Sequence, residues 1–239
     1  MKELTCTTEN KHQYKIMIEN GIKDRLFELD GVFGGYRNIV VISDKNVAKL
    51  YLSGVKKQLK SMGASIYTIV IPAGEASKSL VQAEDIYHQF MDIGITRSDL
   101  IVALGGGVVG DLAGFCAATY MRGLEFVQIP TSLLAQVDSS VGGKVGVDLG
   151  FGKNLVGAFH QPKAVVIDPK FLETLDDHYV ADGMGEVIKY GCISSAKLFV
   201  RLMGFEYQED LMDDMEEIIA KCVQIKRNVV ESDEKETGV

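Results

Sequence analysis

Short apolar runs alternate with longer amphipathic stretches along the chain up to about residue 176. The apolar runs are rich in valine and isoleucine, as is typical of buried β-strands. They predict strands near residues 14–18, 38–43, 66–71, 100–104, 126–129 and 164–167. Between them, residues 47–62 and 80–91 repeat apolar positions at helical spacing and predict helices. This alternation indicates an α/β fold whose parallel sheet is covered by helices on both faces.

The pattern changes after about Asp176. Strand signals end there, and residues 179–203 and 210–234 have the periodicity of helices. We therefore expect residues 1–177 to form an α/β domain and residues 178–239 to begin an all-α domain. The last predicted helix has a broad apolar face, which requires a partner surface that we expect to lie outside this chain.

Composition and charge narrow the function classes. With 46% hydrophobic and 24% charged residues, the 239-residue chain has ample apolar material for a core. Its net charge of −8, without a block of basic residues, argues against a nucleic-acid partner. The chain starts without an apolar signal segment, and Asp111 and several glycines interrupt its most apolar stretch, residues 100–121. We therefore expect neither secretion nor a membrane span.

The cysteines are far apart in the sequence and form no CxxC pair, which favours reduced, buried thiols over a zinc site or a disulfide framework. They are Cys6, Cys116, Cys192 and Cys222. This usage fits a cytoplasmic protein.

A glycine-rich turn follows the predicted strand at residues 100–104 and precedes a helical pattern. It contains Gly105, Gly107 and Gly110 at the spacing G-x-G-x-x-G. Such glycines let backbone N–H groups approach a pyrophosphate, whose charge then meets the positive end of the helix dipole. A crowded turn between a strand and a helix would also require glycines, so this motif alone leaves both interpretations open.

Polar residues follow other predicted strands at the edge where open α/β sheets bind ligands. Asp44, followed by Asn46, ends one strand and could hold a ribose or cap the next helix. Since Asp44 precedes the glycine turn, and Glu125 opens its strand rather than closing it, the order differs from an ordinary Rossmann dehydrogenase. The loops at residues 72–79 and 130–132 offer charges and hydroxyls to a ligand, or are a solvated loop and a helix cap.

Four segments together resemble the 3-dehydroquinate synthase family. They read LGGGVVGDLAGFCAATYMRG, PTSLLAQVDSSVGGKVGVDLGFGKNLVGAFHQP, DGMGEVIKYG and RNVVESDEKE, and they extend over nearly the whole chain. The resemblance implies a Rossmann-like nucleotide-binding α/β domain, a helical C-terminal domain and an active site in the cleft between them.

The resemblance also implies roles for individual residues. NAD would be held by Asp44, Asn46, Gly74, Glu75, Lys78, Gly106, Gly107, Val108, Asp111, Thr131, Ser132, Lys144, Lys153, Phe171, Thr174 and Leu175. Substrate contacts and catalysis would fall to Asp138, Lys144, Asn154, Lys189, Lys226 and Arg122. Arg122 would reach the substrate phosphate of a neighbouring subunit, which requires a homodimer. Converging cations suit a substrate that carries a carboxylate and a phosphate.

The reaction implied is that of an NAD-dependent carbon–oxygen lyase. 3-Deoxy-D-arabino-heptulosonate 7-phosphate would be oxidised transiently, lose phosphate, be reduced again and close to 3-dehydroquinate. A divalent metal, zinc in most of the family with cobalt as the alternative, would be bound by Glu186 and by two histidines of a later segment that this sequence does not contain. We therefore expect a truncated chain that binds NAD weakly and does not turn over as it stands.

Other interpretations stay open. Glu186 and Lys189 could be a surface ion pair, and Lys226 could lie on a solvated helix face, although their motif favours the functional roles. His160 and His178 are expected to be satisfied loop histidines. A related sugar-phosphate cyclase or a polyol dehydrogenase would share the glycine turn and the domain order. A non-catalytic nucleotide-binding or dimerisation fragment is the alternative from another class.

Overall fold

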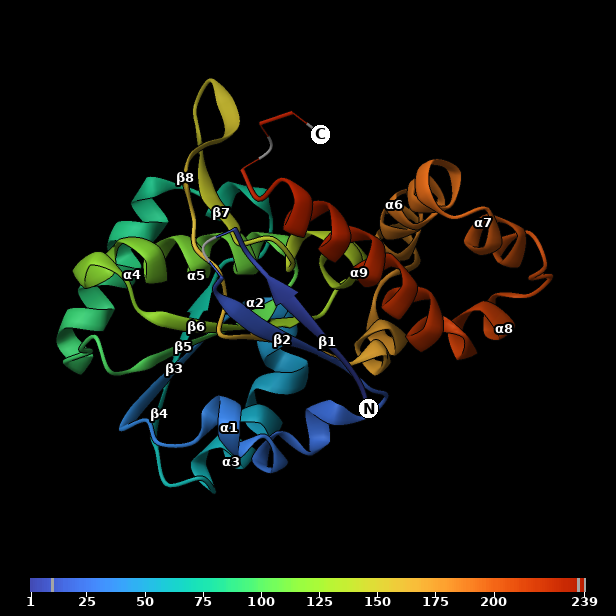
Figure 1. Cartoon of the computed structure of the whole chain (residues 1–239). Coiled ribbons are helices and arrows are strands. Elements are labelled where there is room, and N and C mark those ends of the chain that lie inside the picture. Colours follow the sequence, from blue (N-terminus) through green and yellow to red (C-terminus); the bar gives the residue numbers. More distant parts are fainter. Residues whose placement is uncertain (10, 236, 239) are drawn as a thin grey trace.

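The computed structural model describes residues 1–9, 11–235 and 237–238, and its centre is a seven-stranded sheet (Figure 1). The strands of this sheet are β1 (Lys2–Thr7), β2 (Gln13–Ile18), β3 (Asn38–Asp44), β4 (Ser65–Ile71), β5 (Leu100–Gly105), β6 (Glu125–Pro130) and β9 (Ala164–Ile167). Their order is β1-β2-β9-β6-β5-β3-β4, and β1 is antiparallel to β2 whereas the other neighbours pair in parallel. The predicted α/β class and its six strands are confirmed, but the sheet is mixed rather than purely parallel.

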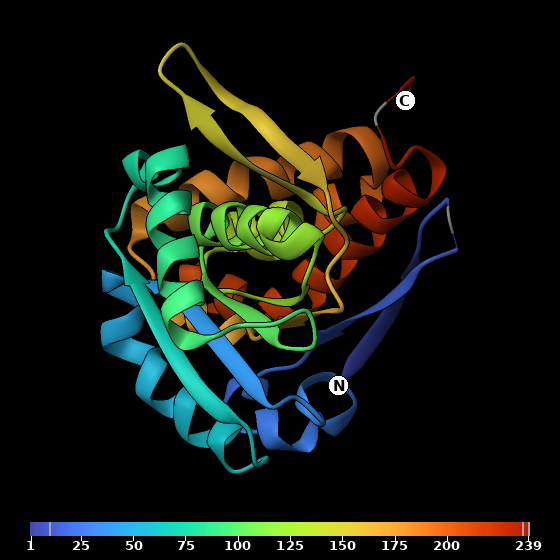
Figure 2. The ribbon, with the colours of Figure 1, turned by 90° about the vertical axis from the view of Figure 1, so that its left-hand side faces the viewer.

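The sequence did not predict two parts of the β-structure, the edge strand β1 and a separate hairpin. β1 is an edge strand in which Cys6 alone is buried, so it lacks an apolar run. A separate hairpin of β7 (Lys144–Leu149) and β8 (Gly152–Phe159) projects from the body of the molecule (Figures 1 and 2). Its sequence is rich in glycine and mostly exposed in β8, which weakens the hydrophobic signal that identifies a strand.

Helices cover both faces of the sheet. They are α1 (Asp30–Phe33), α2 (Lys45–Val47), α3 (Ser53–Lys60), α4 (Leu80–Ile93), α5 (Gly107–Thr119), α6 (Asp177–Ser194), α7 (Ala196–Leu202), α8 (Gln208–Asp213) and α9 (Met215–Ser232). Successive residues of β3 illustrate why the central strands are apolar throughout. Val40 and Ile42 share a buried cluster with α4 and α5, whereas Ile39 and Val41 share another with α1 and α3.

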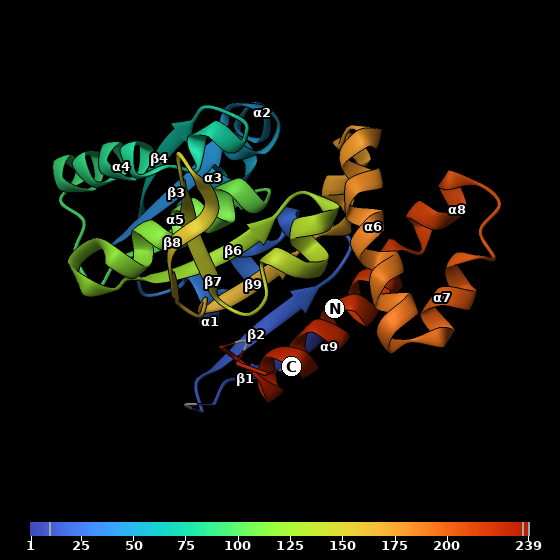
Figure 3. The same ribbon diagram turned by 90° about the horizontal axis from the view of Figure 1, so that it is seen from above.

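The C-terminal helices gather at the β1–β2–β9 side of the sheet (Figure 3). The predicted helix at 179–203 is divided into α6 and α7, because the Ser195 hydroxyl accepts a hydrogen bond from the Leu198 N–H and starts a new helix. Along α9, residues such as Ile219 and Val223 are fully buried. The helix packs against β1 and α6 of the same chain. The expectation that this apolar face needs a surface outside the chain was therefore wrong for most of the helix.

The predicted division at residues 177 and 178 stays a prediction. Helix α6 begins at Asp177, but one apolar cluster joins β2 and β9 to α6 and α9. Within the described residues, the helices are all too short or too polar to cross a membrane.

Candidate functional site

The carboxyl ends of β3 and β5 form a topological switch point. These strands are neighbours, but the chain leaves β3 for β4 on one side and leaves β5 for β6 on the other. The loops after the two strands therefore diverge, and open α/β sheets bind ligands in the crevice that such a divergence creates. Asp44 and Gly105 end these two strands, so both lie at the switch point.

The glycine turn at this point is required by packing and also fits an anion. A Cβ atom on Gly105 would lie 2.5 Å from the Val109 Cγ2 atom, and one on Gly110 would lie 2.6 Å from Gln128 Oε1. These two glycines confirm the crowded-turn interpretation. Gly106 caps α5 and Gly107 begins it, and the first N–H groups of a helix have no acceptor within that helix. They could meet a phosphate, so the crowded-turn interpretation is confirmed and the pyrophosphate interpretation stays a prediction.

Residues after β6 border the same turn. The Thr131 N–H donates to the Gly105 carbonyl at 2.9 Å, and a Cβ atom on Gly106 would lie 3.3 Å from Ser132 Oγ. Ser132 Oγ also accepts from the Ala135 N–H at 3.4 Å, as the helix-cap alternative predicts. Val108, in the first turn of α5, completes this part of the predicted NAD set.

Asp44 is the N-cap of α2. One of its carboxylate oxygens accepts hydrogen bonds from the N–H groups of Asn46 at 2.8 Å and Val47 at 3.2 Å. The cap interpretation is therefore confirmed. A role of Asp44 and Asn46 in holding a ribose stays a prediction.

A buried lysine lies among carboxylates beside the glycine turn. We call this group the Lys78 cluster, and it consists of Lys78, Glu75, Asp111, Asp148 and Asn154. The Lys78 ammonium is 2.6 Å from Asn154 Oδ1 and 3.2 Å from Asp111 Oδ2. It is also 3.5 Å from Glu75 Oε1 and 3.8 Å from Asp148 Oδ1, although the Lys78 residue is only 5% exposed.

Burial and charge compete within the Lys78 cluster. Burial raises the pKa of Asp111 to about 6, although Lys78 opposes this shift. Burial alone would lower the pKa of Lys78, but the charges of Asp111, Glu75 and Asp148 hold it above its ordinary value. The lysine is therefore a firmly protonated cation, whereas Asp111 titrates closer to neutrality than an ordinary aspartate.

Two further members of the predicted NAD set belong to the loops around this cluster. Gly74 precedes Glu75 and has a left-handed φ of 101°, which favours glycine. The exposed Lys153 ammonium lies 3.1 Å from Glu75 Oε1 at the hairpin turn.

A second group has the opposite arrangement and lies between the segment Ala135–Ser139 (η6) and the C-terminal helices. We call it the Asp138 cluster, and it consists of Asp138, Tyr190, Lys226 and Lys144. Asp138 Oδ1 accepts from the Tyr190 hydroxyl at 2.9 Å and lies 2.7 Å from the Lys226 ammonium. Lys226 therefore does not occupy a solvated helix face; its side chain is 13% exposed.

Cations dominate the electrostatics of the Asp138 cluster. Burial would raise the pKa of Asp138, but the Lys226 charge, the hydrogen bonds from Lys226 and Tyr190, and the Lys144 charge together lower it below its ordinary value. Burial and the adjacent carboxylate raise the pKa of Tyr190. The Tyr190 hydroxyl thus remains a hydrogen-bond donor to an ionised carboxylate.

Glu186 and Lys189 form an ion pair one turn apart on α6, as the simpler interpretation predicts, but the Glu186 side chain is only 16% exposed, so the pair is not fully at the surface. Lys189 also lies over the Tyr190 ring, with its ammonium 5.2 Å from the ring centroid, so the pair adjoins the Asp138 cluster. Among the residues that the structure describes, no three histidine, cysteine, aspartate or glutamate side chains are grouped to hold a metal ion. Glu186 by itself therefore does not form a metal site.

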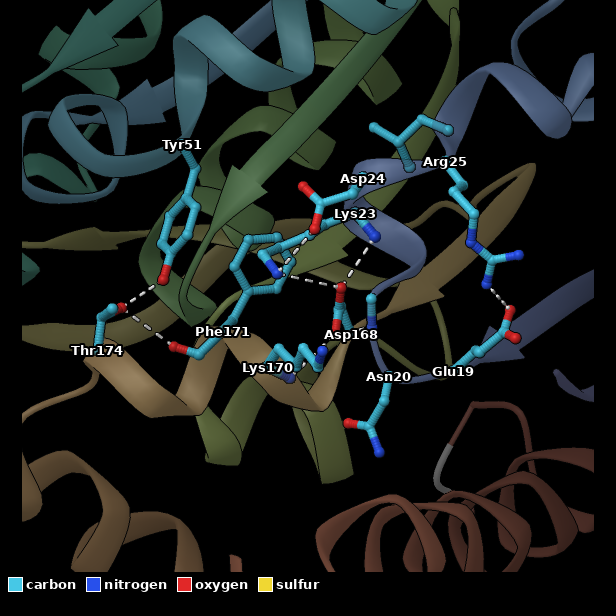
Figure 4. A network of polar contacts seen from close by, with 12 residues as sticks. Glu19, Asn20, Lys23, Asp24, Arg25, Tyr51, Asp168, Lys170, Phe171 and Thr174 are labelled. Carbon is cyan, nitrogen blue, oxygen red and sulfur yellow. Dashed lines mark hydrogen bonds and ion pairs between the residues drawn. The ribbon is translucent and has the colours of Figure 1, made fainter. Parts of the chain in front are cut away.

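The segment Pro169–Thr174 (η7) follows β9 at the same sheet edge (Figure 4). The Phe171 ring is 1% exposed and packs edge-on against Tyr51, whose hydroxyl bonds to Thr174. A ligand could thus meet the backbone of Phe171 but not its ring. The preceding Asp168 is fully buried and anchors the segment by accepting hydrogen bonds from backbone N–H groups of residues 21, 23 and 170. Leu175 follows directly and is partly buried.

Arg122 lies far from the other residues of the predicted site. It follows α5 at the end opposite the glycine turn, and a helix of 13 residues separates the two ends by about 20 Å. Arg122 is exposed, and it and Met121 have left-handed φ values of 71° and 50°, which is strained for residues other than glycine.

The structure adds two residues that sequence reasoning missed, Asp148 and Tyr190. Asp148 lies in the hairpin that was not predicted, and Tyr190 was visible only as a neighbour of Lys189. The expectation for His160 is confirmed, since its ring bonds to the Leu124 carbonyl at 2.8 Å. The expectation was wrong for His178, which lies in the first turn of α6 rather than in a loop; its side chain is 76% exposed and 3.8 Å from Asp182.

Sequence comparisons with known proteins extend over the whole chain. Family models described as 3-dehydroquinate synthase N-terminal and 3-dehydroquinate synthase C-terminal match residues 68–182 and 183–239. The chain is 54% identical over 228 residues to a 3-dehydroquinate synthase of Clostridium acetobutylicum, with 95% of this chain and 64% of that protein covered. It is 52% identical over 239 residues to the one of Clostridium perfringens, of which it covers 68%. The chain thus spans about two thirds of the length of these relatives.

Solved structures show the same fold. A 2-deoxy-scyllo-inosose synthase with carbaglucose-6-phosphate, NAD+ and Co2+ superposes with a TM-score of 0.86 at 24% identity, covering 99% of this chain and 64% of that one. The 2-epi-5-epi-valiolone synthase ValA of Streptomyces hygroscopicus subsp. jinggangensis, with NAD+ and Zn2+ bound, gives 0.85 at 25% identity, covering 94% and 63%. A glycerol dehydrogenase of Schizosaccharomyces pombe gives 0.63 at 15% identity, covering 88% and 58%.

Proposed function

Since this chain belongs to the 3-dehydroquinate synthase family, a family of lyases, we propose that it supplies the NAD site and most of the substrate site of such an enzyme. The reaction is the conversion of 3-deoxy-D-arabino-heptulosonate 7-phosphate to 3-dehydroquinate with release of phosphate. It belongs to the shikimate pathway, which leads to the aromatic amino acids.

The observation that carries this proposal is that two charge clusters both adjoin the start of the helix that follows the glycine turn. Asp111 of the Lys78 cluster is in the first turns of α5. Ser139, next to Asp138, lies against the start of the same helix, because a Cβ atom on Gly107 would be 3.2 Å from Ser139 Oγ. A nucleotide whose pyrophosphate lies at the turn would therefore adjoin both clusters.

The residues present fit NAD. The helix N-terminus after Gly106 suits the pyrophosphate, and Asp44 and Asn46 at the neighbouring strand end suit the adenosine. When bound, NAD supplies a hydride acceptor for the C5 hydroxyl and a hydride donor later in the reaction. Lys78 and Asp111 would then border the nicotinamide end.

The Asp138 cluster suits an anionic sugar phosphate. Lys144, Lys189 and Lys226 supply positive charge for the carboxylate and phosphate of the substrate. Asp138 aligns Lys226 and accepts from Tyr190, so the ammonium and the hydroxyl are held in fixed positions before the substrate arrives.

The metal part of the family's chemistry does not fit the described residues. Glu186 is one oxygen ligand, and a catalytic zinc normally takes three protein ligands. We propose instead that the 239 residues bind NAD weakly and do not complete turnover alone.

Arg122 supports a homodimer. Its strained, exposed backbone lies about 20 Å from the glycine turn, too far for its side chain to reach a substrate bound beside that turn in the same subunit. We propose that it contacts the substrate phosphate of a neighbouring subunit.

A related sugar-phosphate cyclase is the second candidate, because the fold match to 2-deoxy-scyllo-inosose synthase is close. A polyol dehydrogenase and a non-catalytic nucleotide-binding module are further alternatives. The substrate separates these candidates, since only the proposed enzyme would release phosphate from the heptulosonate phosphate.

The test is a chimera in which residues 1–239 are fused to the remaining C-terminal part of the Clostridium acetobutylicum relative. With NAD and zinc, the chimera should release phosphate from 3-deoxy-D-arabino-heptulosonate 7-phosphate and form 3-dehydroquinate, while its Lys226→Met variant should not. A folded chimera that binds NAD but releases no phosphate would contradict the proposed activity. Phosphate release by residues 1–239 alone would contradict the need for further ligands.

A further inference from the structure

Asp148 links the β7–β8 hairpin to the rest of the Lys78 cluster through two separate contacts, one made by its carboxylate and one by its backbone N–H. Its Oδ1 atom accepts a hydrogen bond from the Asn154 N–H at 2.7 Å, across the turn of the hairpin. Its own N–H donates to the Lys78 carbonyl at 2.9 Å, which ties the hairpin to the loop after β4. The Asp148 side chain is 18% exposed, so solvent competes only weakly for these contacts.

Asn154 needs such a partner because its backbone is left-handed. Its φ is 56°, a conformation that costs free energy for any residue with a Cβ atom, although asparagine tolerates it better than most. In this conformation, Asn154 Oδ1 accepts from the Lys78 ammonium at 2.6 Å. The Asp148 carboxylate thus stabilises the backbone that places the Asn154 amide on Lys78.

The charge of Asp148 contributes less than this geometry. Its Oδ1 atom is 3.8 Å from the Lys78 ammonium, whereas Asp111 Oδ2 lies at 3.2 Å. The charges of Asp111 and Glu75 each raise the pKa of Lys78 more than the charge of Asp148 does. An amide in place of the carboxylate would therefore keep most of the effect, since its oxygen still accepts from the Asn154 N–H.

We propose that Asp148 is a positioning residue that holds Asn154 in its left-handed conformation and thereby fixes Asn154 and Lys78 for ligand binding. Asp148 acts through Asn154 and does not itself touch the nucleotide. This inference rests on the proposed function, because it assigns Lys78 and Asn154 to the NAD and substrate sites.

The test compares Asp148→Ala, Asp148→Asn, Asn154→Gly and the double variant Asp148→Ala/Asn154→Gly. Asp92→Ala, on the exposed side of α4, is the matched loss of one carboxylate. NADH affinity is measured by nucleotide fluorescence, which has no tryptophan background because the chain contains no tryptophan. Exchange of the Asn154 amide proton, measured by NMR, reports the hydrogen bond directly. Thermal melting of every variant identifies any that fail to fold.

We expect Asp148→Ala to weaken NADH binding about tenfold and to abolish protection of the Asn154 amide. Asp148→Asn should stay within about threefold of the wild type and keep the protection. Because glycine adopts a positive φ without a partner, Asp148→Ala should have no further effect in the Asn154→Gly chain.

Unchanged NADH affinity in a folded Asp148→Ala chain would overturn the inference. So would an equal, additive loss in the Asn154→Gly background, because Asp148 would then act independently of Asn154. If the wild-type chain shows no saturable NADH binding, the proposed function fails instead, and the Asn154 amide still decides the positioning role. Protection that survives Asp148→Ala would refute that role.

Discussion

The Lys78 cluster and the Asp138 cluster have opposite arrangements of charge. In the first, a buried cation lies among Asp111, Glu75 and Asp148. In the second, a partly buried carboxylate lies against Lys226 and near Lys144. Burial dominates at Asp111 and raises its pKa to about 6, whereas neighbouring cations dominate at Asp138 and lower its pKa.

This difference explains how one crevice can bind two ligands of different charge. The carboxylates around Lys78 oppose the approach of a phosphate or carboxylate, whereas the cations around Asp138 attract one. The glycine turn, which both clusters adjoin, supplies N–H groups for the pyrophosphate. We therefore expect the nucleotide to depend on the Lys78 side and the anionic substrate on the Asp138 side.

The largest expected effect is on nucleotide binding. Gly105→Ala would force a Cβ atom to within 2.5 Å of Val109 and displace the start of α5. NADH affinity measured by fluorescence titration should fall by at least about 100-fold, because the helix N–H groups lose their alignment.

Gly54→Ala is the matched control for that change. Gly54 is in α3 with open space around its Cα atom, so an alanine there should leave NADH affinity unchanged and raise stability by up to about 1 kcal/mol. Wild-type affinity in a folded Gly105→Ala chain would show that the turn does not bind the nucleotide.

The next effect breaks the Asp138 side. Lys226→Met leaves the Asp138 carboxylate without its nearest cation, and we expect the free energy of unfolding in urea to fall by about 2–4 kcal/mol. Lys221→Met, an exposed change on the same helix, should cost less than about 0.5 kcal/mol. Adding Asp138→Asn to Lys226→Met should recover part of the loss; a further additive loss would exclude coupling between the two residues.

The opposite pKa shifts predict opposite pH dependences. The folded-state pKa of Asp111 is raised from 3.8 to about 6, so its ionisation destabilises the fold as pH rises through this window. Asp111→Asn should therefore gain stability relative to the wild type between about pH 4 and pH 7, by about 1–3 kcal/mol.

Asp138 has the reverse sign. Its pKa is lowered in the folded chain, so its stabilisation is present above the ordinary value of 3.8 and is lost as pH falls through the folded-state pKa. The stability of Asp138→Asn should therefore fall relative to the wild type as pH rises into the neutral range. Urea unfolding at a series of pH values measures both slopes, and slopes of the same sign would contradict the comparison.

The smallest effect separates burial from proximity. Lys153 and Lys78 both lie close to Glu75 Oε1, at 3.1 Å and 3.5 Å, but the Lys153 side chain is 73% exposed. Lys153→Ala should change the free energy of unfolding by less than about 0.5 kcal/mol, because solvent screens the pair. A loss above about 1 kcal/mol in urea unfolding would show that the hairpin turn is more closely packed than its exposure indicates.

The sequence predicted the features that depend on local patterns. Consecutive apolar residues in β3 and β5 and the glycine spacing after β5 were sufficient to predict the parallel strands and the turn. The motif residues Asp138, Lys226 and Lys144 were also identified, through their family resemblance, and the structure brings them together.

What the sequence did not predict depends on long-range pairing. The hairpin is glycine-rich and exposed, so its strands have little apolar signal, and Asp148 within it was missed. Its contact with Asn154 forms only when the hairpin turn closes, and its contact with Lys78 forms only when the hairpin packs on the loop after β4. The apolar face of α9 was recognised, but its partner surface, which includes β1, comes from the opposite end of the chain.

The central claim is that the nucleotide binds at the switch point between β3 and β5 and not in the Asp138 cluster. Hydrogen–deuterium exchange of the chain with and without NAD tests this claim most directly. We predict slower exchange in peptides that cover residues 43–47, 74–79 and 105–111, with peptides of α6 and α9 unchanged. Protection confined to α6 and α9, with the glycine turn unaffected by saturating NAD, would contradict it.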